Sequence, residues 1–360
     1  MAVFDSIKSG CSVSSIHPVD KSLGAIWQDV LQRHCIGLDD NFFDLGGNVA
    51  AADRMFARIA HECGRELPSA TIYHAPTISA LAAVLENPTP PRYSPFVHLK
   101  KGTEGPPILI AHGLDGRAGF FGLAKCIPTG QPVYGIQGKG LDGLEEPFDR
   151  IGDMAQFYLD ALNELQPEGP YILMGYSFGG LVALEMAQRL SANGKNVALL
   201  ALVDTYPHPQ HLTMGQRIRL SARRGKRHIS EMRQRSIGGA MRYVSDGIEH
   251  RFGIAVSRNQ STVPTEGSRL SLARTTTQVK AKARVALSHY QPLPYRGKIC
   301  FVKSENDPYF PGDPVPVWAH LAEAFEVRNV PGGHLDVITA HYESLAAVLT
   351  DYVNQALGQR

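Results

Sequence analysis

Residues 171–190, YILMGYSFGGLVALEMAQRL, decide the fold of the larger part of this chain. The short apolar run YILM predicts a buried strand, and LVALEMAQRL is typical of a helix. Between them, residues 175–179 form a G-x-S-x-G motif in the strand–turn–helix context of a nucleophile elbow. The glycines permit a tight turn, and the amino terminus of the helix favours negative charge developing beside Ser177. An incidental serine in a glycine-rich loop is the alternative interpretation, and it fits this context less well.

The surrounding sequence has the same alternation of strand and helix patterns. Helical stretches such as IGDMAQFYLDALNEL separate short apolar runs, namely PILIAH, VYGIQ, VALLALVD and KICFVKS. This order predicts, for residues 96–360, a mostly parallel sheet with helices on both faces. The alternation of strand and helix patterns stops at about 209–285, where we find no clear buried strand. Residues 217–235 of this insert carry eight Arg or Lys and one Glu.

A catalytic serine in an α/β-hydrolase fold needs an acid and then a histidine later in the chain. Asp204 ends the run ALLALVD, Asp307 follows KICFVKSEND, and His334 lies in the loop NVPGGHLDV. We expect His334 to accept the Ser177 proton and return it to the leaving group, while a carboxylate orients the imidazole. Both acids precede the histidine, so chain order alone does not separate them.

Two backbone amides complete the predicted site. The loop after the strand PILIA begins His112-Gly113-Leu114, and in this architecture that loop supplies one oxyanion-hole amide. The residue after the nucleophile supplies the other. We therefore assign these amides to Leu114 and Phe178, and we expect the His112 imidazole to brace the loop.

The first quarter of the chain differs in character. Residues 18–86 contain helical periodicity and few strand signals, which predicts a small all-helical bundle. The proline-rich stretch 88–95, PTPPRYSP, is the predicted linker between the two parts. A length of 360 residues suits two domains.

Bulk properties exclude several classes of function. A formal net charge of +2 is too small to indicate nucleic-acid or membrane binding by itself. Five scattered cysteines without a CxxC pair favour neither a disulfide framework nor a zinc site, and they suit a reducing cytoplasm. We find no metal-ligand motif, no nucleotide-binding motif, and no apolar run long enough for a signal peptide or membrane span.

Residues 96–360 resemble the type I thioesterase domains of nonribosomal peptide synthetases. The matching pieces are the HGLDG loop, GYSFGGLVALEMAQRL, LVDTYP, HYQPLPYRGKICFVKSEND and PGGHLDV. The resemblance favours Asp204 over Asp307 as the acid and implies that the insert at 209–285 is a mobile helical lid. The basic face of the insert could be solvated surface, or it could steer an acidic carrier or anionic substrate.

Residues 17–87 resemble a four-helix peptidyl carrier protein, through HPVDKSLGAIWQDVLQRHCIGLDDNFFDLGGN and IYHAPTISALAAVLE. The family attaches 4′-phosphopantetheine to a serine after LGG and one polar residue, and here that position is Val49. Valine has no hydroxyl, so the group cannot be attached there. Ser12, Ser14 and Ser15 lie outside the motif. The intact LGG favours an engineered replacement of the serine over a naturally degenerate carrier that acts in docking, and both interpretations stay open.

The resemblance implies a terminal thioesterase that takes an acyl or peptidyl thioester onto Ser177. Release would follow by hydrolysis, to which we lean, or by cyclisation. Expected partners are upstream synthetase modules or stand-alone adenylation and condensation proteins, with a phosphopantetheinyl transferase if the native carrier has serine at 49. An acyltransferase using the same triad and a non-catalytic docking role are the alternatives.

Overall fold

The computed structural model describes residues 18–87, 94–218, 220–222, 268, 270–306 and 313–358. The chain divides into two units, residues 1–92 and 93–360. Three predicted features fall wholly or partly outside the described residues: the candidate acid Asp307, most of the linker 88–95 and much of the lid at 209–285. The exact domain limits stay predictions.

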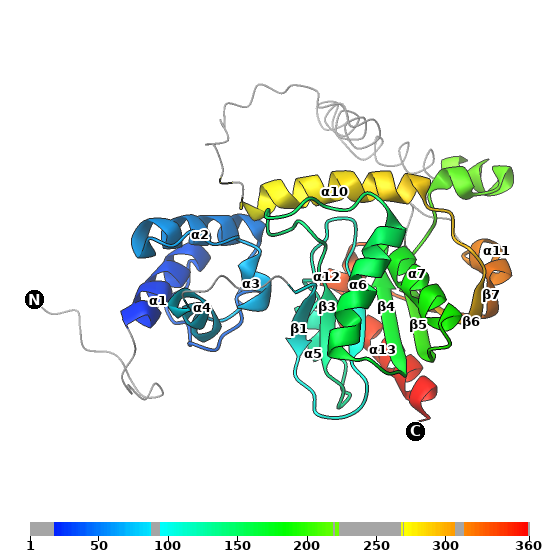
Figure 1. The fold of residues 1–360 in the computed structure, drawn as a ribbon, viewed down its shortest axis with the longest axis horizontal. Coiled ribbons are helices and arrows are strands. Elements are labelled where there is room, and N and C mark those ends of the chain that lie inside the picture. Colours follow the sequence, from blue (N-terminus) through cyan, green and yellow to red (C-terminus); the bar gives the residue numbers. More distant parts are fainter. Residues whose placement is uncertain are drawn as a thin grey trace, which may run out of the picture. The chain divides into compact units, whose positions relative to one another are not determined.

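The first unit is a small helical bundle, as predicted (Figure 1). Its helix α1 packs against both α2 and α4. Side chains such as Trp27, Phe42 and Ile59 are fully buried between the helices and form its core. The four helices are α1 (Pro18–Leu31), α2 (Val49–Cys63), α3 (Thr71–His74) and α4 (Ile78–Glu86).

The second unit is built on a seven-stranded sheet in the order β1-β3-β2-β4-β5-β6-β7. All neighbouring pairs are parallel except β1 and β3, so the predicted mostly parallel sheet is confirmed. The five apolar runs correspond to the five strands from β2 to β6. The strands are β1 (Phe96–Lys100), β2 (Ile108–Ala111), β3 (Val133–Ile136), β4 (Tyr171–Tyr176), β5 (Val197–Val203), β6 (Tyr295–Ser304) and β7 (Ala322–Val330).

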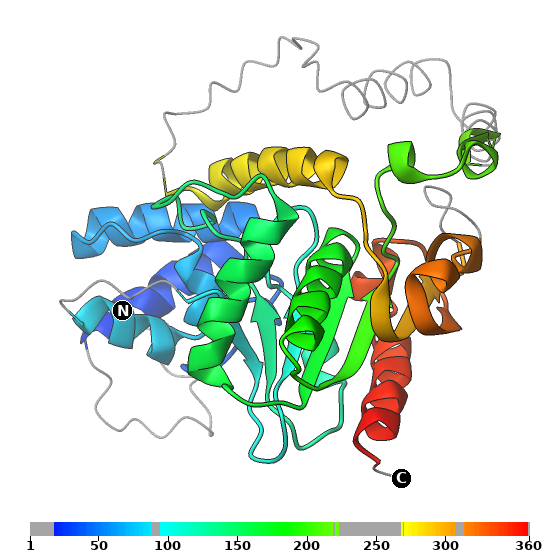
Figure 2. The same ribbon diagram turned by 45° about the vertical axis from the view of Figure 1, so that its right-hand side comes forward.

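Helices cover both faces of this sheet (Figures 1 and 2). The helices α6 (Ile151–Leu165) and α7 (Phe178–Ala192) pack together on one face, and α5 (Phe121–Lys125) and α13 (Tyr342–Leu357) lie together on the other. The central helix α7 is buried along most of its length, which explains its near-continuous apolar sequence. Shorter elements are α11 (Val315–Trp318), α12 (Asp336–Thr339) and the 3-10 turns η1 (Pro209–His211) and η2 (Ala319–Leu321).

The described part of the insert contains the long helix α10 (Leu272–His289), which continues four residues beyond the expected limit at 285. Its buried side chains recur every three or four residues, and it packs against α6. Val279 lies directly on the loop after β2: a Cβ at Gly116 would be 2.6 Å from Val279 Cγ1. The described end of the insert is therefore seated on the loop predicted to hold an oxyanion amide.

Within the described ranges, no helix combines the length and the apolar character that crossing a bilayer requires.

Candidate active site

Ser177 occupies the sharp turn between β4 and α7. Its backbone φ of 55° and ψ of −118° is a strained conformation for a residue with a side chain. The Ser177 N–H donates to the carbonyl of Val203 on the neighbouring strand, at 2.8 Å. Gly179 must be glycine here, because a Cβ would lie 2.2 Å from the His112 carbonyl oxygen. The strand–turn–helix geometry predicted around Ser177 is thus present.

His334 reaches this serine from the loop between β7 and α12. Its Nε2 lies 3.0 Å from Ser177 Oγ, within hydrogen-bonding distance although the two residues are 157 positions apart. The side chain is 16 % exposed, so the imidazole lies in a largely desolvated position that still has access to solvent.

Asp204 lies on the other side of the imidazole and is buried. Its Oδ2 is 3.4 Å from His334 Nδ1, which is within ion-pair distance and longer than an ordinary N–H···O hydrogen bond. Ser304, at the end of β6, donates its N–H to Asp204 Oδ1 at 2.9 Å and its hydroxyl to Oδ2 at 2.5 Å. The structure therefore brings Ser177, His334 and Asp204 together, with the imidazole between the hydroxyl and the carboxylate.

The loop after β2 runs beside the elbow. Ala111 pairs with Gly175 in the sheet register, so the next residues, His112 to Leu114, leave the sheet next to Ser177. Leu114 is half-buried, and Phe178 is buried at the start of α7. This places both predicted oxyanion residues in the vicinity of the nucleophile.

His112 braces that loop. Its Nδ1 lies 2.6 Å from the Gly113 carbonyl, so Nδ1 carries the hydrogen and Nε2 accepts from the Tyr158 hydroxyl at 3.0 Å. Burial lowers the pKa of His112, which favours this neutral form. Val279 and Ala283 of α10 line a small cavity beside the His112–Tyr158 pair.

The position corresponding to phosphopantetheine attachment lies in the helical unit, where Val49 is the first residue of α2. The preceding turn is intact: Gly46 has a φ of +93°, and a Cβ at Gly47 would lie 2.3 Å from the Phe42 ring. The Asn48 side chain accepts the Ala51 N–H at 3.0 Å and caps the helix. Because valine offers no nucleophilic atom, the residues present do not fit covalent phosphopantetheine.

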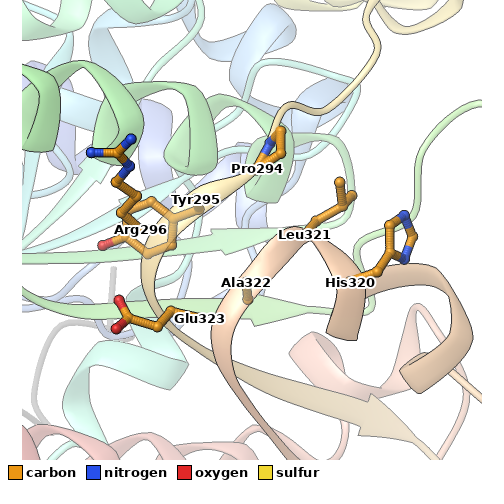
Figure 3. A pocket seen from close by; sticks show the side chains of 7 residues that line it. All are labelled: Pro294, Tyr295, Arg296, His320, Leu321, Ala322 and Glu323. Atoms are coloured by element: carbon orange, nitrogen blue, oxygen red, sulfur yellow. The ribbon is translucent and has the colours of Figure 1, made fainter.

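A separate depression of about 410 Å³ lies between the start of β6 and the segment leading into β7 (Figure 3). It is at the amino end of β6, whereas Ser304 at the carboxyl end contacts Asp204. A strand of ten residues separates the two places by roughly 30 Å. The depression is therefore not part of this site. Its lining residues are Pro294, Tyr295, Arg296, His320, Leu321, Ala322 and Glu323.

Sequence reasoning missed Ser304 and Tyr176. Ser304 ends the run KICFVKS, and a parallel pairing of this run with the one ending at Asp204 would have put the two side chains at the same edge. Tyr176 occupies a variable position of the G-x-S-x-G motif, and no sequence pattern indicated its contacts with His334.

Fold and geometry define an α/β-hydrolase with a serine at its elbow. The profile of the family described as "Thioesterase domain" matches residues 106–352, and that described as "Phosphopantetheine attachment site" matches residues 21–85. The chain belongs to the thioesterase domain family, whose members are serine hydrolases acting on thioesters, and it carries a carrier-like unit in front of that domain.

Its relatives are large synthetases. The chain is 30 % identical over 331 residues to malpibaldin synthetase of Mortierella alpina, covering 89 % of this chain and 5 % of the synthetase. It is 35 % identical over 193 residues to a dimodular nonribosomal peptide synthase of Bacillus subtilis (strain 168), covering 53 % of this chain and 8 % of that protein. The chain thus spans a small fraction of the length of these relatives.

A solved structure with the same fold is that of a four-domain nonribosomal peptide synthetase in its holo form, bound to AMP and glycine. The match covers 97 % of this chain and 27 % of the synthetase chain, with a TM-score of 0.53 and 22 % identity. At this identity the likeness shows the fold alone.

Proposed function

We propose that this chain releases an acyl or peptidyl chain from a carrier-bound thioester through a covalent intermediate on Ser177. The observation that carries the proposal is the 3.0 Å approach of His334 Nε2 to Ser177 Oγ, with Asp204 behind the imidazole. Relatives whose names include nonribosomal peptide synthase or synthetase support an acyl group made by such an assembly line.

In the first half-reaction, Ser177 Oγ attacks the thioester carbonyl and His334 accepts the hydroxyl proton at Nε2. The backbone N–H groups of Leu114 and Phe178 would stabilise the oxyanion of the tetrahedral intermediate. When the C–S bond breaks, the imidazolium returns the proton to the departing thiolate. Asp204 holds the ring in place and stabilises its charged form throughout.

In the second half-reaction, a nucleophile attacks the acyl-enzyme ester. With water, His334 takes one proton, the bond between the acyl carbon and Ser177 Oγ breaks, and the serine recovers its proton, giving a free acid. An internal amine or hydroxyl in place of water would give a ring. We favour water because the His334 side chain retains some exposure to solvent.

The thioester must come from another carrier. Val49 cannot hold phosphopantetheine, so the helical unit of this chain does not load its own substrate. Upstream synthetase modules or separate adenylation and condensation proteins are the proposed suppliers. The retained turn at Gly46 and Gly47 supports a second, docking role for the unit, because the shape of the attachment loop persists without its serine.

The test is turnover of an acyl N-acetylcysteamine thioester, with mass spectrometry of the protein. We expect the wild type to form an acyl-enzyme and Ser177→Ala to form none and to lose turnover. Ser288→Ala is the matched control, because its hydroxyl bonds only within α10, to Val285 at 2.8 Å. Undiminished turnover by Ser177→Ala would refute the proposal.

A further inference from the structure

We propose that Tyr176 is a positioning residue for His334, a role that rests on the proposed function. Two contacts carry the inference. The tyrosine hydroxyl donates to the main-chain carbonyl of His334 at 2.7 Å. The two rings are stacked, with centroids 4.9 Å apart and planes inclined by 23°. One side chain thus holds both the backbone and the ring of the residue that meets the nucleophile.

Tyr176 is itself firmly held. It is the last residue of β4, a strand with neighbours on both sides, and its side chain is only 6 % exposed. Phe120 packs edge-on against its ring at 6.4 Å, and a Cβ at Gly113 would lie 3.4 Å from it. The ring therefore stands between the loop after β2 and the His334 loop, anchored in the sheet.

The His334 loop needs such an anchor. Its other described main-chain bonds involve the residues on either side of His334. Asn306 N–H donates to the Gly332 carbonyl, and Asp336 accepts the Gly333 N–H. The Gly333 and Leu335 carbonyls accept from the N–H groups of Val337 and Ile338, at the start of α12. Without Tyr176, the carbonyl of His334 loses its link to the strand that carries Ser177. A side chain that must keep its Nε2 near Ser177 Oγ and its Nδ1 near Asp204 loses reactivity when displaced by a fraction of an ångström.

The chain offers a matched control on the same strand. Tyr171, at the opposite end of β4, is buried and donates its hydroxyl to the Pro167 carbonyl at 3.0 Å. The Tyr171 hydroxyl also has a longer contact with the Gln166 carbonyl, at 3.4 Å. Tyr171→Phe and Tyr176→Phe therefore each remove a tyrosine hydroxyl of β4 that bonds to main-chain carbonyls. Only the second deletion touches the His334 loop. Tyr176→Leu removes the stacked ring as well.

The readouts are hydrolysis of a p-nitrophenyl acyl ester and the rate of labelling by a fluorophosphonate. In labelling, the Ser177 Oγ–P bond forms, fluoride leaves, and His334 takes the hydroxyl proton. We expect Tyr176→Phe to lower the labelling rate and kcat by about 3- to 10-fold with KM within about twofold, because one partly buried hydrogen bond is lost. Tyr176→Leu should lower them by about 10- to 100-fold.

Tyr171→Phe should be labelled at the wild-type rate. Its Tm should change by about as much as that of Tyr176→Phe, so a difference in labelling between the two variants reflects positioning and not general stability. The inference is overturned if Tyr176→Phe is labelled as fast as the wild type. It is also overturned if Tyr176→Phe and Tyr171→Phe lose the same fraction of the labelling rate. Both tests hold even if Tyr176→Leu fails to fold. Ser177→Ala keeps the two proposals apart. If Ser177→Ala is still labelled, the proposed function is wrong. If Ser177→Ala is not labelled and Tyr176→Phe is labelled at the wild-type rate, only the role proposed for Tyr176 is wrong.

Discussion

Ser304→Ala tests how the carboxylate behind His334 is held. The Ser304 hydroxyl donates to Asp204 Oδ2 at 2.5 Å, and both side chains are buried. A hydrogen bond to a charged group contributes about 1.5–3 kcal/mol, and alanine leaves that carboxylate oxygen without the donor. For a unit of this size the loss corresponds to a fall in Tm of roughly 3–12 °C. We also expect kcat to fall on the order of 10-fold, because the Asp204 carboxylate would then be held by the Ser304 N–H at 2.9 Å and by the longer 3.4 Å contact with His334 Nδ1.

The assay is thermal unfolding followed by circular dichroism, together with ester hydrolysis at saturating substrate. Ser288→Ala is the control, because it deletes a serine hydroxyl that bonds within its own helix. The reasoning fails if Ser304→Ala unfolds at the same temperature as the control and keeps its kcat, because the short contact would then contribute nothing to the buried carboxylate.

Four further predictions follow from the structure. Asp204→Asn should lower kcat by about 10³- to 10⁴-fold in ester hydrolysis with little change in KM, and a smaller effect than Ser304→Ala would exclude Asp204 as the acid. Gly180→Ala should lower the Tm and the yield of folded protein, because a Cβ would lie within 2 Å of the Thr205 hydroxyl; a wild-type Tm would show that the elbow can shift. Val49→Ser should gain the mass of one phosphopantetheine when incubated with a phosphopantetheinyl transferase and coenzyme A, whereas the unaltered chain gains none; modification of the unaltered chain would locate another acceptor. Burial lowers the pKa of His112 below its ordinary 6.5, so the unfolded chain binds more protons in mild acid and the Tm should fall from pH 7.5 to about pH 5.5; His112→Gln should flatten this dependence, and an unchanged slope would contradict the assignment.

The core strands of the sheet could be predicted because each is a short apolar run buried on both faces. The two edge strands could not. In β7, the sequence AEAFEVRNV mixes charged and apolar residues, and most of its side chains are half-buried or exposed. In β1, a five-residue strand pairs antiparallel with β3 and follows a proline-rich stretch. An edge strand needs neither continuous apolarity nor strict alternation, so its sequence carries a weak signal.

The turn that carries Ser177 could be predicted from local sequence, whereas the arrangement around it depends on contacts between distant segments. Chain order left Asp204 and Asp307 equivalent as candidate acids. What places Asp204 is the pairing of β5 with β6, through which its N–H reaches the Val302 carbonyl at 2.9 Å and its carboxylate reaches Ser304. Such a contact joins residues about one hundred positions apart, and a single sequence does not reveal the register that creates it.

Two residues of the site share the same backbone conformation. Among the described residues of the second unit, Ser177 and Asp204 are the non-glycine residues with positive φ, at 55° and 44°. Each follows the last residue of a parallel strand, and each donates its N–H to the strand next to it, Ser177 to Val203 and Asp204 to Val302.

A positive φ at a residue with a side chain costs on the order of 1–3 kcal/mol, and the sheet compensates by fixing the backbone on both sides. The backbone geometry of Ser177 and Asp204 is therefore fixed by the sheet. Helix α10 of the insert contributes Val279 and Ala283 to the small cavity beside His112. Substitutions in α10 are therefore expected to leave the backbone of Ser177 and Asp204 in place, because the sheet fixes it.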